Sequence, residues 1–252
     1  MNEEILNPLT ENLHLETKSQ ETELHETLYP SKKNLPPDLR EYIDEVLANK
    51  IPQRCPYIPR LGRFLYDHTR HLSLTHFREA FVNKGLWVCI DQTWTKILAE
   101  WIGKRRTLEV MAGGGWIAKA LQDHGVSIVA TDQDAKWHNR HKELPTWPDL
   151  QVLKMGARKA VNSYTTAEVL VISWPPYTNT EIVRVMDAWG TTRPVIYIGE
   201  SVGGCTACDT FFDHFEMEEF IPELHLQQWP GINDYVFTGF WTRKPKTPKK
   251  TQ

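Results

Sequence analysis

From residue 106 onward the chain alternates short apolar runs with stretches of helical periodicity. The apolar runs are TLEVMA, VSIVATD, LQVLKM, EVLVISW and PVIYIGE, and helical segments such as WIAKALQDHG and EIVRVMDAW separate several of them. Parallel strands need crossover connections, which are usually helices. The alternation therefore predicts an α/β fold with a doubly wound, mostly parallel sheet that carries helices on both faces.

The carboxyl-terminal part of the chain has a different pattern. Two strand-like runs, ELHLQQW and YVFTGFWTR, flank a turn at residues 230–234 that begins with Pro-Gly. Two strands joined by a short turn pair with each other in antiparallel fashion. We therefore expect an antiparallel C-terminal hairpin at one edge of the sheet.

Helical patterns precede the alternation. The segment PPDLREYIDEVLAN begins with two prolines, and SLTHFREAFVNKG ends on a glycine, as helices often do. They predict a helical N-terminal extension over residues 36–90. A third helix is expected between the N-cap residue Asp91 and Gly103, and it opens a Rossmann-like domain over residues 91–243.

The two ends of the chain have polar compositions. Residues 1–35 hold seven glutamates and few large apolar side chains, so they cannot bury enough surface to offset the loss of chain entropy. We expect this acidic segment to be disordered. Residues 244–252 are rich in lysine and contain prolines, which is typical of a solvated basic tail.

Charge and cysteine usage exclude several broad classes. A net charge of −3 is too small to indicate a nucleic-acid or membrane partner. The four cysteines are unevenly spaced and do not resemble the disulfide framework of a small secreted domain. No basic leader or apolar stretch of about 20 residues is evident. We expect a cytoplasmic protein with reduced thiols and no membrane partner.

The most informative motif is the stretch TLEVMAGGGW, which places three glycines between a strand and a helix. Glycine allows a tight turn and a close approach to a ligand, and the following helix presents free N–H groups. Asp132 follows nineteen residues after Gly113, at the carboxyl end of the next predicted strand, where an acid can bind ribose hydroxyls. The pairing indicates a nucleotide-like ligand.

This order of motifs resembles the class I S-adenosylmethionine-dependent methyltransferases, whose first motif runs acid-apolar-Gly-x-Gly-x-Gly. Glu109, Gly113 and Gly115 match the acid and the last two glycines, Asp132 matches the ribose-binding acid, and Met111 stands where the first glycine is expected. The resemblance implies a seven-strand sheet with a reversed last strand and S-adenosyl-L-methionine as the cofactor. It also implies a set of cofactor-binding residues: Glu109, Met111, Ala112, Gly113, Gly115, Asp132 and Gly156.

A second motif, ISWPPY, ends the predicted strand of residues 169–173. It resembles the amino-group methyltransferases of the N6-adenine and N4-cytosine type, in which a polar residue precedes Pro-Pro-aromatic. There the polar side chain and the first proline carbonyl hold the amine N–H groups, and the aromatic ring stacks on the substrate. Trp174 occupies the polar position, and its indole N–H is only a donor. Ser173, backbone carbonyls, or an acceptor other than a base amine remain the alternatives.

The set implied for catalysis is Ser173, Trp174, Pro175, Pro176, Tyr177 and Glu200. Glu200 belongs to it because it lies near the carboxyl end of the fifth predicted strand, where ligands of open α/β sheets bind. No metal site is expected, since Cys205 and Cys208 have zinc-like spacing but lack a second pair.

The sequence therefore predicts an S-adenosylmethionine-dependent methyltransferase. The resemblance implies a nitrogen acceptor on a planar group, such as a nucleic-acid base. The alternative is a catalytically inactive methyltransferase fold that acts as a binding module, with Met111 and Trp174 as marks of a lost site.

Overall fold

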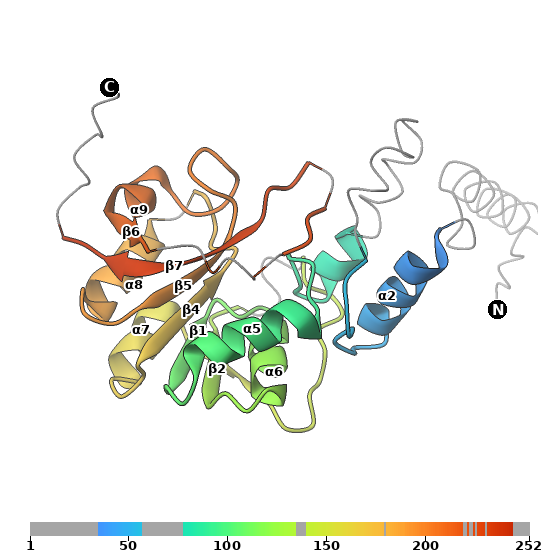
Figure 1. Cartoon of the computed structure of the whole chain (residues 1–252). Coiled ribbons are helices and arrows are strands. Elements are labelled where there is room, and N and C mark those ends of the chain that lie inside the picture. The colour runs from blue at the N-terminus through green and yellow to red at the C-terminus, as the bar shows by residue number, and fades with distance from the viewer. Residues whose placement is uncertain are drawn as a thin grey trace, which may run out of the picture.

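A seven-stranded sheet forms the centre of the molecule, with the order β3-β2-β1-β4-β5-β7-β6 (Figure 1). The computed structural model of the chain describes residues 35–56, 78–134, 140–178, 180–218, 221, 224, 226–229 and 231–243. The strands are β1 (Thr107–Val110), β2 (Ile128–Asp132), β3 (Val152–Lys154), β4 (Val169–Ser173), β5 (Val195–Gly199), β6 (Phe215–Met217) and β7 (Tyr235–Trp241). β1 to β5 pair in parallel, and β7 runs antiparallel between β5 and β6. The predicted fold class is confirmed.

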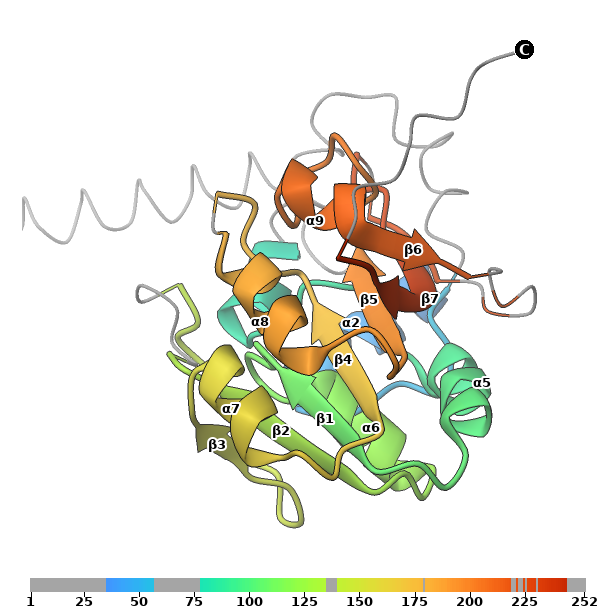
Figure 2. The same cartoon turned by 90° about the vertical axis from the view of Figure 1, so that its left-hand side faces the viewer.

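The central strands are continuously apolar because both faces of the sheet are covered. All residues of β1 and β5 are buried, as are four of the five in β4. β3 and β6 form the two edges of the sheet (Figure 2). A parallel sheet with helices on both sides needs this pattern of unbroken burial, which explains why the apolar runs located the strands.

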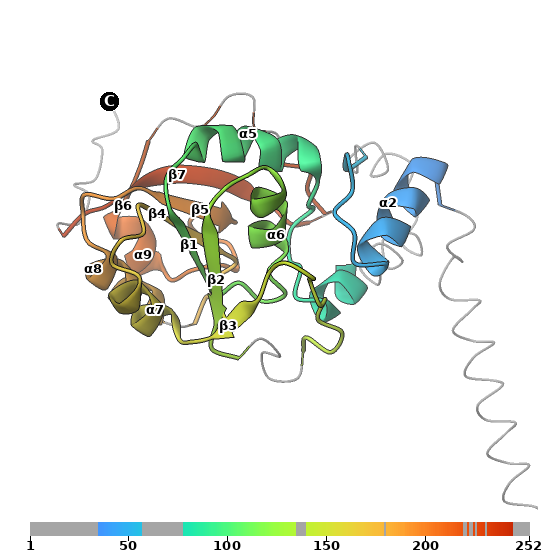
Figure 3. The same ribbon diagram turned by 90° about the horizontal axis from the view of Figure 1, so that it is seen from below.

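Two hydrophobic cores lie on opposite faces of the sheet (Figure 3). One is closed by α5 (Gln92–Ile102) and α6 (Trp116–Asp123). The other is closed by α7 (Ala157–Ser163), α8 (Glu181–Trp189) and α9 (Asp209–His214). The sequence patterns indicated α5, α6 and α8, whereas the short helices α7 and α9 were not predicted.

The amino-terminal segment packs on the first of these cores. α2 (Pro37–Leu47) lies beside the helical residues 78–83 at one end of the sheet (Figure 1). The rings of Tyr42 and Phe81 are 5.8 Å apart, and Phe81 meets Trp229 edge-on at 5.2 Å. The start of the second predicted helix, the acidic segment up to residue 34 and the basic tail lie outside the described residues.

The antiparallel pair at the carboxyl end is present, but its outer strand is not the predicted one. β6 follows α9 directly and pairs with β7, whereas the described residues of ELHLQQW lie in no strand. Leu224 and Trp229 from that run are buried in the core beneath α5. The run is therefore apolar because its side chains are buried, and not because it pairs as a strand. Among the described helices, none has the length and apolar character needed to cross a membrane.

Asp91 is the N-cap of α5, as predicted. Its Oδ1 accepts hydrogen bonds from the N–H groups of Thr93 and Trp94, and its Oδ2 accepts one from Cys55. The carboxylate therefore links the loop at Cys55 to the N-terminus of the helix that covers the sheet.

We expect Asp91→Ala to lower the free energy of unfolding by about 2 kcal/mol, because three N–H groups lose their acceptor. Urea denaturation followed by circular dichroism measures this change. Lys96→Ala on the exposed face of the same helix is the control, with an expected change below about 0.5 kcal/mol. Equal stabilities of the two variants would contradict the role of this cap.

Candidate functional site

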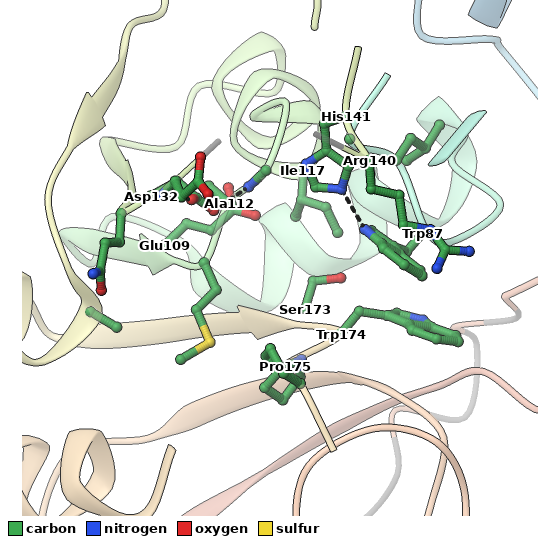
Figure 4. A pocket seen from close by; sticks show the side chains of 18 of the residues that line it. Trp87, Glu109, Ala112, Ile117, Asp132, Arg140, His141, Ser173, Trp174 and Pro175 are labelled. Atoms are coloured by element: carbon green, nitrogen blue, oxygen red, sulfur yellow. Dashed lines mark hydrogen bonds between the residues drawn. The ribbon is translucent and has the colours of Figure 1, made fainter. Parts of the chain in front are cut away.

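A cavity of about 580 Å³ lies at the carboxyl ends of β1, β2 and β4 (Figure 4). Ligands of open α/β sheets bind at this edge of the sheet, and the volume is within the range of small-molecule sites. Met111 follows β1, Asp132 ends β2 and Ser173 ends β4, and all three line the cavity.

The glycine turn after β1 is shaped by a second stretch of backbone. A Cβ atom on Gly114 would lie 2.4 Å from the carbonyl oxygen of Lys84, and one on Gly113 would lie 2.9 Å from that of Gly85. Gly113 and Gly115 also adopt left-handed conformations, with φ of +52° and +71°. Gly113 and Gly114 are therefore needed for a close crossing of two backbone segments.

Met111, which stands where the family motif has its first glycine, has a left-handed backbone. Its φ is +57°, in the left-handed region that glycine adopts without cost. For other residues this conformation costs roughly 1–2 kcal/mol. The chain thus adopts a conformation typical of glycine at a residue whose side chain lines the cavity.

Asp132, the last residue of β2, is hydrogen-bonded to the glycine turn. Its Oδ2 accepts a hydrogen bond from the N–H of Gly113 at 2.8 Å, and its Oδ1 accepts one from that of Asp134 at 2.9 Å. Burial raises the pKa of this carboxyl, while the two N–H donors act in the opposite direction. A carboxylate has about four lone-pair positions, so two remain for a ligand.

Glu109 is buried beneath the turn. Its Oε2 accepts a hydrogen bond of 2.9 Å from the N–H of Ala118 in the first turn of α6. Burial raises the pKa of Glu109 to about 8, against the lowering effect of this hydrogen bond. The side chain therefore lines the cavity with a carboxyl group that is largely neutral at pH 7.

The ISWPPY motif forms a tight corner at the end of β4. Trp174 has a φ of +49°, and its N–H donates to the carbonyl of Ile198 in β5 at 2.8 Å. Its indole Nε1–H donates to Asp234 Oδ1 at 2.7 Å. The carbonyl of Pro175 accepts from the N–H of Ala207 at 2.9 Å. Neighbouring loops thus hold this corner from two sides.

An aromatic wall, which we define as Trp87 and Trp174, closes one side of the cavity (Figure 4). The two rings stack at 5.2 Å with an angle of 21°. The guanidinium carbon of Arg78 lies 5.0 Å from the Trp174 ring centroid, and that of Arg140 lies 5.4 Å from Trp87. Trp87 Nε1–H donates to His141 Nε2 at 3.2 Å.

Sequence reasoning missed Trp87, Arg140 and His141 as cavity residues. They belong to no motif, and only the fold brings their segments to the end of β4. Residues 85–88, which precede α5, line one side of the cavity. α5 itself packs against α6.

Most of the predicted site residues meet in this cavity. Those that line it are Glu109, Met111, Ala112, Gly113, Asp132, Ser173, Trp174, Pro175, Pro176 and Tyr177. Gly115, Gly156 and Glu200 do not line it. Gly115 packs against Val152, where a Cβ would come within 2.6 Å of the valine Cγ2, and Gly156 precedes α7.

Glu200 has a place in the loop that follows β5. Its carboxylate accepts hydrogen bonds from the N–H groups of Cys205, at 2.6 Å, and Asn233, at 3.1 Å. The side chain is buried, and the loop it holds carries Ala207 to the Pro175 carbonyl. Among the described residues, no cluster of three or more His, Cys, Asp or Glu side chains is arranged to hold a metal ion.

No protein-family model matches the sequence, and none of the curated proteins matches it either. The fold is similar to that of a TehB-like S-adenosylmethionine-dependent methyltransferase from Corynebacterium glutamicum, with 14% identity and a TM-score of 0.40 over 68% of this chain and 98% of the other. A 16S rRNA adenine-N(1) methyltransferase from Catenulisporales acidiphilia gives 10% identity and a TM-score of 0.35 over 60% and 91%. Similarities at this level carry no argument about function, which therefore rests on the geometry of the site.

Glu109→Gln tests the buried carboxyl. Because the pKa is raised from 4.5 to about 8 on folding, the native state binds more protons than the unfolded state between these values, and the free energy of unfolding falls as pH rises through them. Glutamine cannot ionise and retains an oxygen for Ala118. We expect the variant to gain roughly 2 kcal/mol or more relative to the parent between about pH 5 and pH 8.

Urea denaturation at the two pH values measures this difference. Glu100→Gln, on the exposed face of α5, is the matched control and should follow the parent at both. A constant difference between Glu109→Gln and the parent would show that the buried carboxyl titrates normally.

Proposed function

We propose that the protein is an S-adenosylmethionine-dependent methyltransferase that methylates a nitrogen on a planar, nucleic-acid-like acceptor. One observation carries the proposal: a single cavity contains the glycine turn, Asp132 and the ISWPPY corner. These three features were predicted from separate stretches of sequence. Their meeting at one edge of the sheet supports a shared site for a cofactor and an acceptor.

The residues present fit the proposed cofactor. Asp132 has free lone-pair positions on the cavity side of its two backbone contacts, which suits ribose hydroxyls. The turn of Met111 to Gly113 lies next to it and would hold the methionine part. Glu109 lies beneath that turn, and a nearby cation would favour its ionised form. When bound, the cofactor supplies a methyl group on a positively charged sulfur.

The acceptor would lie at the ISWPPY corner. Tyr177 is 49% exposed at the cavity, and Ser173 contributes a hydroxyl. The strained backbone at Trp174 and the rigid Pro175 and Pro176 fix this side of the site. Methyl transfer needs no covalent enzyme intermediate, so the residues act by aligning the two reactants and excluding water.

The inactive binding module is the second candidate, because Met111 and Trp174 depart from the motifs. The left-handed conformation of Met111 favours the enzyme, since this is a conformation that glycine adopts without cost and the turn forms here without a glycine. We also propose a cytoplasmic location, because all four cysteines are free thiols, as is usual in a reducing compartment.

Calorimetric titration with S-adenosylmethionine tests the proposal. We expect saturable binding, and we expect Asp132→Ala to weaken it by at least about tenfold, which is about 1.4 kcal/mol. Asp132→Asn removes the charge but keeps an acceptor for the N–H of Gly113. It therefore shows whether weaker binding comes from the lost charge or from a disturbed glycine turn. Asp149→Ala, an exposed carboxylate that does not line the cavity, is the control and should bind as the parent does. Absence of binding at millimolar cofactor would remove the enzyme hypothesis.

A further inference from the structure

The side chain of Trp174 is held at the cavity wall by contacts with other parts of the chain. Its Nε1–H is committed to Asp234 Oδ1 at 2.7 Å, and Asp234 is 1% exposed. The ring is also stacked on Trp87 and lies under Arg78. These contacts fix the orientation of the indole, and its N–H is only a donor, so the side chain of residue 174 offers no hydrogen-bond acceptor to a substrate.

The second expected acceptor is also engaged. The carbonyl of Pro175 already accepts a hydrogen bond from Ala207, and the next residues pair through an isolated antiparallel bridge between Pro176 and Thr206. Within residues 173–175 this leaves the hydroxyl of Ser173 as the side-chain acceptor in the cavity (Figure 4). A carbonyl oxygen has two lone pairs, so Pro175 keeps one of them, and the end of β4 lacks the acceptor that a polar side chain at position 174 would provide.

An exocyclic amine on a base needs such acceptors. Its lone pair is delocalised into the ring, and the nitrogen attacks only when its N–H groups are held and one proton can leave. A pyridine-like ring nitrogen differs, because its lone pair lies in the ring plane and the atom carries no proton. We propose that the methyl acceptor is a pyridine-like ring nitrogen of a nucleobase. This inference rests on the proposed function.

The reaction balances without a base. The ring nitrogen's lone pair forms a bond to the methyl carbon, the carbon–sulfur bond breaks, and its electron pair remains on sulfur. The positive charge moves from sulfur to the ring, and no proton is released. Ser173 would hold a neighbouring group of the base and orient the ring in the plane needed for attack.

The charges around the cavity suit a cationic product. Asp132 and Asp134 line the cavity as carboxyl groups and Arg140 as the guanidinium group, whereas Glu181 pairs with Arg158 and Arg184 and Glu109 is largely neutral. Outside the lining, Arg78 has Asp234 as a nearby opposite charge. A neutral base that becomes a cation during transfer therefore gains favourable interactions as its charge develops.

The experiment uses the full chain with S-adenosylmethionine carrying a labelled methyl group. Mixed-sequence single-stranded RNA and DNA and the free nucleosides serve as acceptors, and the products are digested in mildly acidic buffer and identified by mass spectrometry against standards. We expect label in 1-methyladenine, 3-methylcytosine or 7-methylguanine. Label in N6-methyladenine or N4-methylcytosine, or in no base, overturns the inference. Lack of cofactor binding in the titration would instead remove the proposed function itself.

Substitution of Trp174 provides a second measurement. Trp174→Asp restores a carboxylate acceptor and tolerates the left-handed backbone, whereas Trp174→Phe keeps a ring for stacking on Trp87. We expect Trp174→Asp to lower ring-nitrogen methylation at least tenfold and Trp174→Phe to lower it less, with cofactor binding retained in both. Increased methylation by Trp174→Asp would show that a missing polar acceptor limits the protein, and would overturn the inference.

Discussion

The structure depends on one close crossing of two backbone segments. Gly113 and Gly114 lie so near Lys84 and Gly85 that added Cβ atoms would overlap carbonyl or amide atoms at 2.4 to 2.9 Å. Trp116 Nε1–H donates to the carbonyl of Lys84 at 2.8 Å. This crossing fixes the amino-terminal segment against the first strand and helix of the sheet. Residues 85–88 follow directly from it, and they supply one side of the cavity.

The crossing gives the glycines a physical reason that the motif alone did not provide. In the motif, glycines are explained by the approach of a ligand. Here the space beside Gly114 is filled by protein backbone, and the cavity is lined by the neighbouring residues Met111, Ala112 and Gly113. The turn is therefore preorganised by its own chain before any ligand is bound. Preorganised groups lose less entropy when they bind.

The strands could be predicted because burial on both faces leaves a local signature, as in Val195 to Gly199. The cap at Asp91 was predictable because two of its partners, Thr93 and Trp94, are near in sequence, whereas its contact with Cys55 was not. The outer strand of the hairpin was not, because Leu224 and Trp229 are buried without pairing. The aromatic wall could not be predicted from the sequence, since Trp87 and Trp174 meet only through the fold. Glu200 lies near the carboxyl end of β5, where ligands of open α/β sheets bind. Its carboxylate nevertheless holds a loop.

The aromatic wall has a spectroscopic consequence. The chain has ten tryptophans, so its fluorescence averages many environments. Trp87 and Trp174 are stacked at 5.2 Å and 21°, and at this distance the electronic transitions of two indoles couple. Coupled transitions give paired bands of opposite sign in circular dichroism. A group that enters the cavity and displaces either ring changes these bands, so the protein carries its own optical reporter of occupancy.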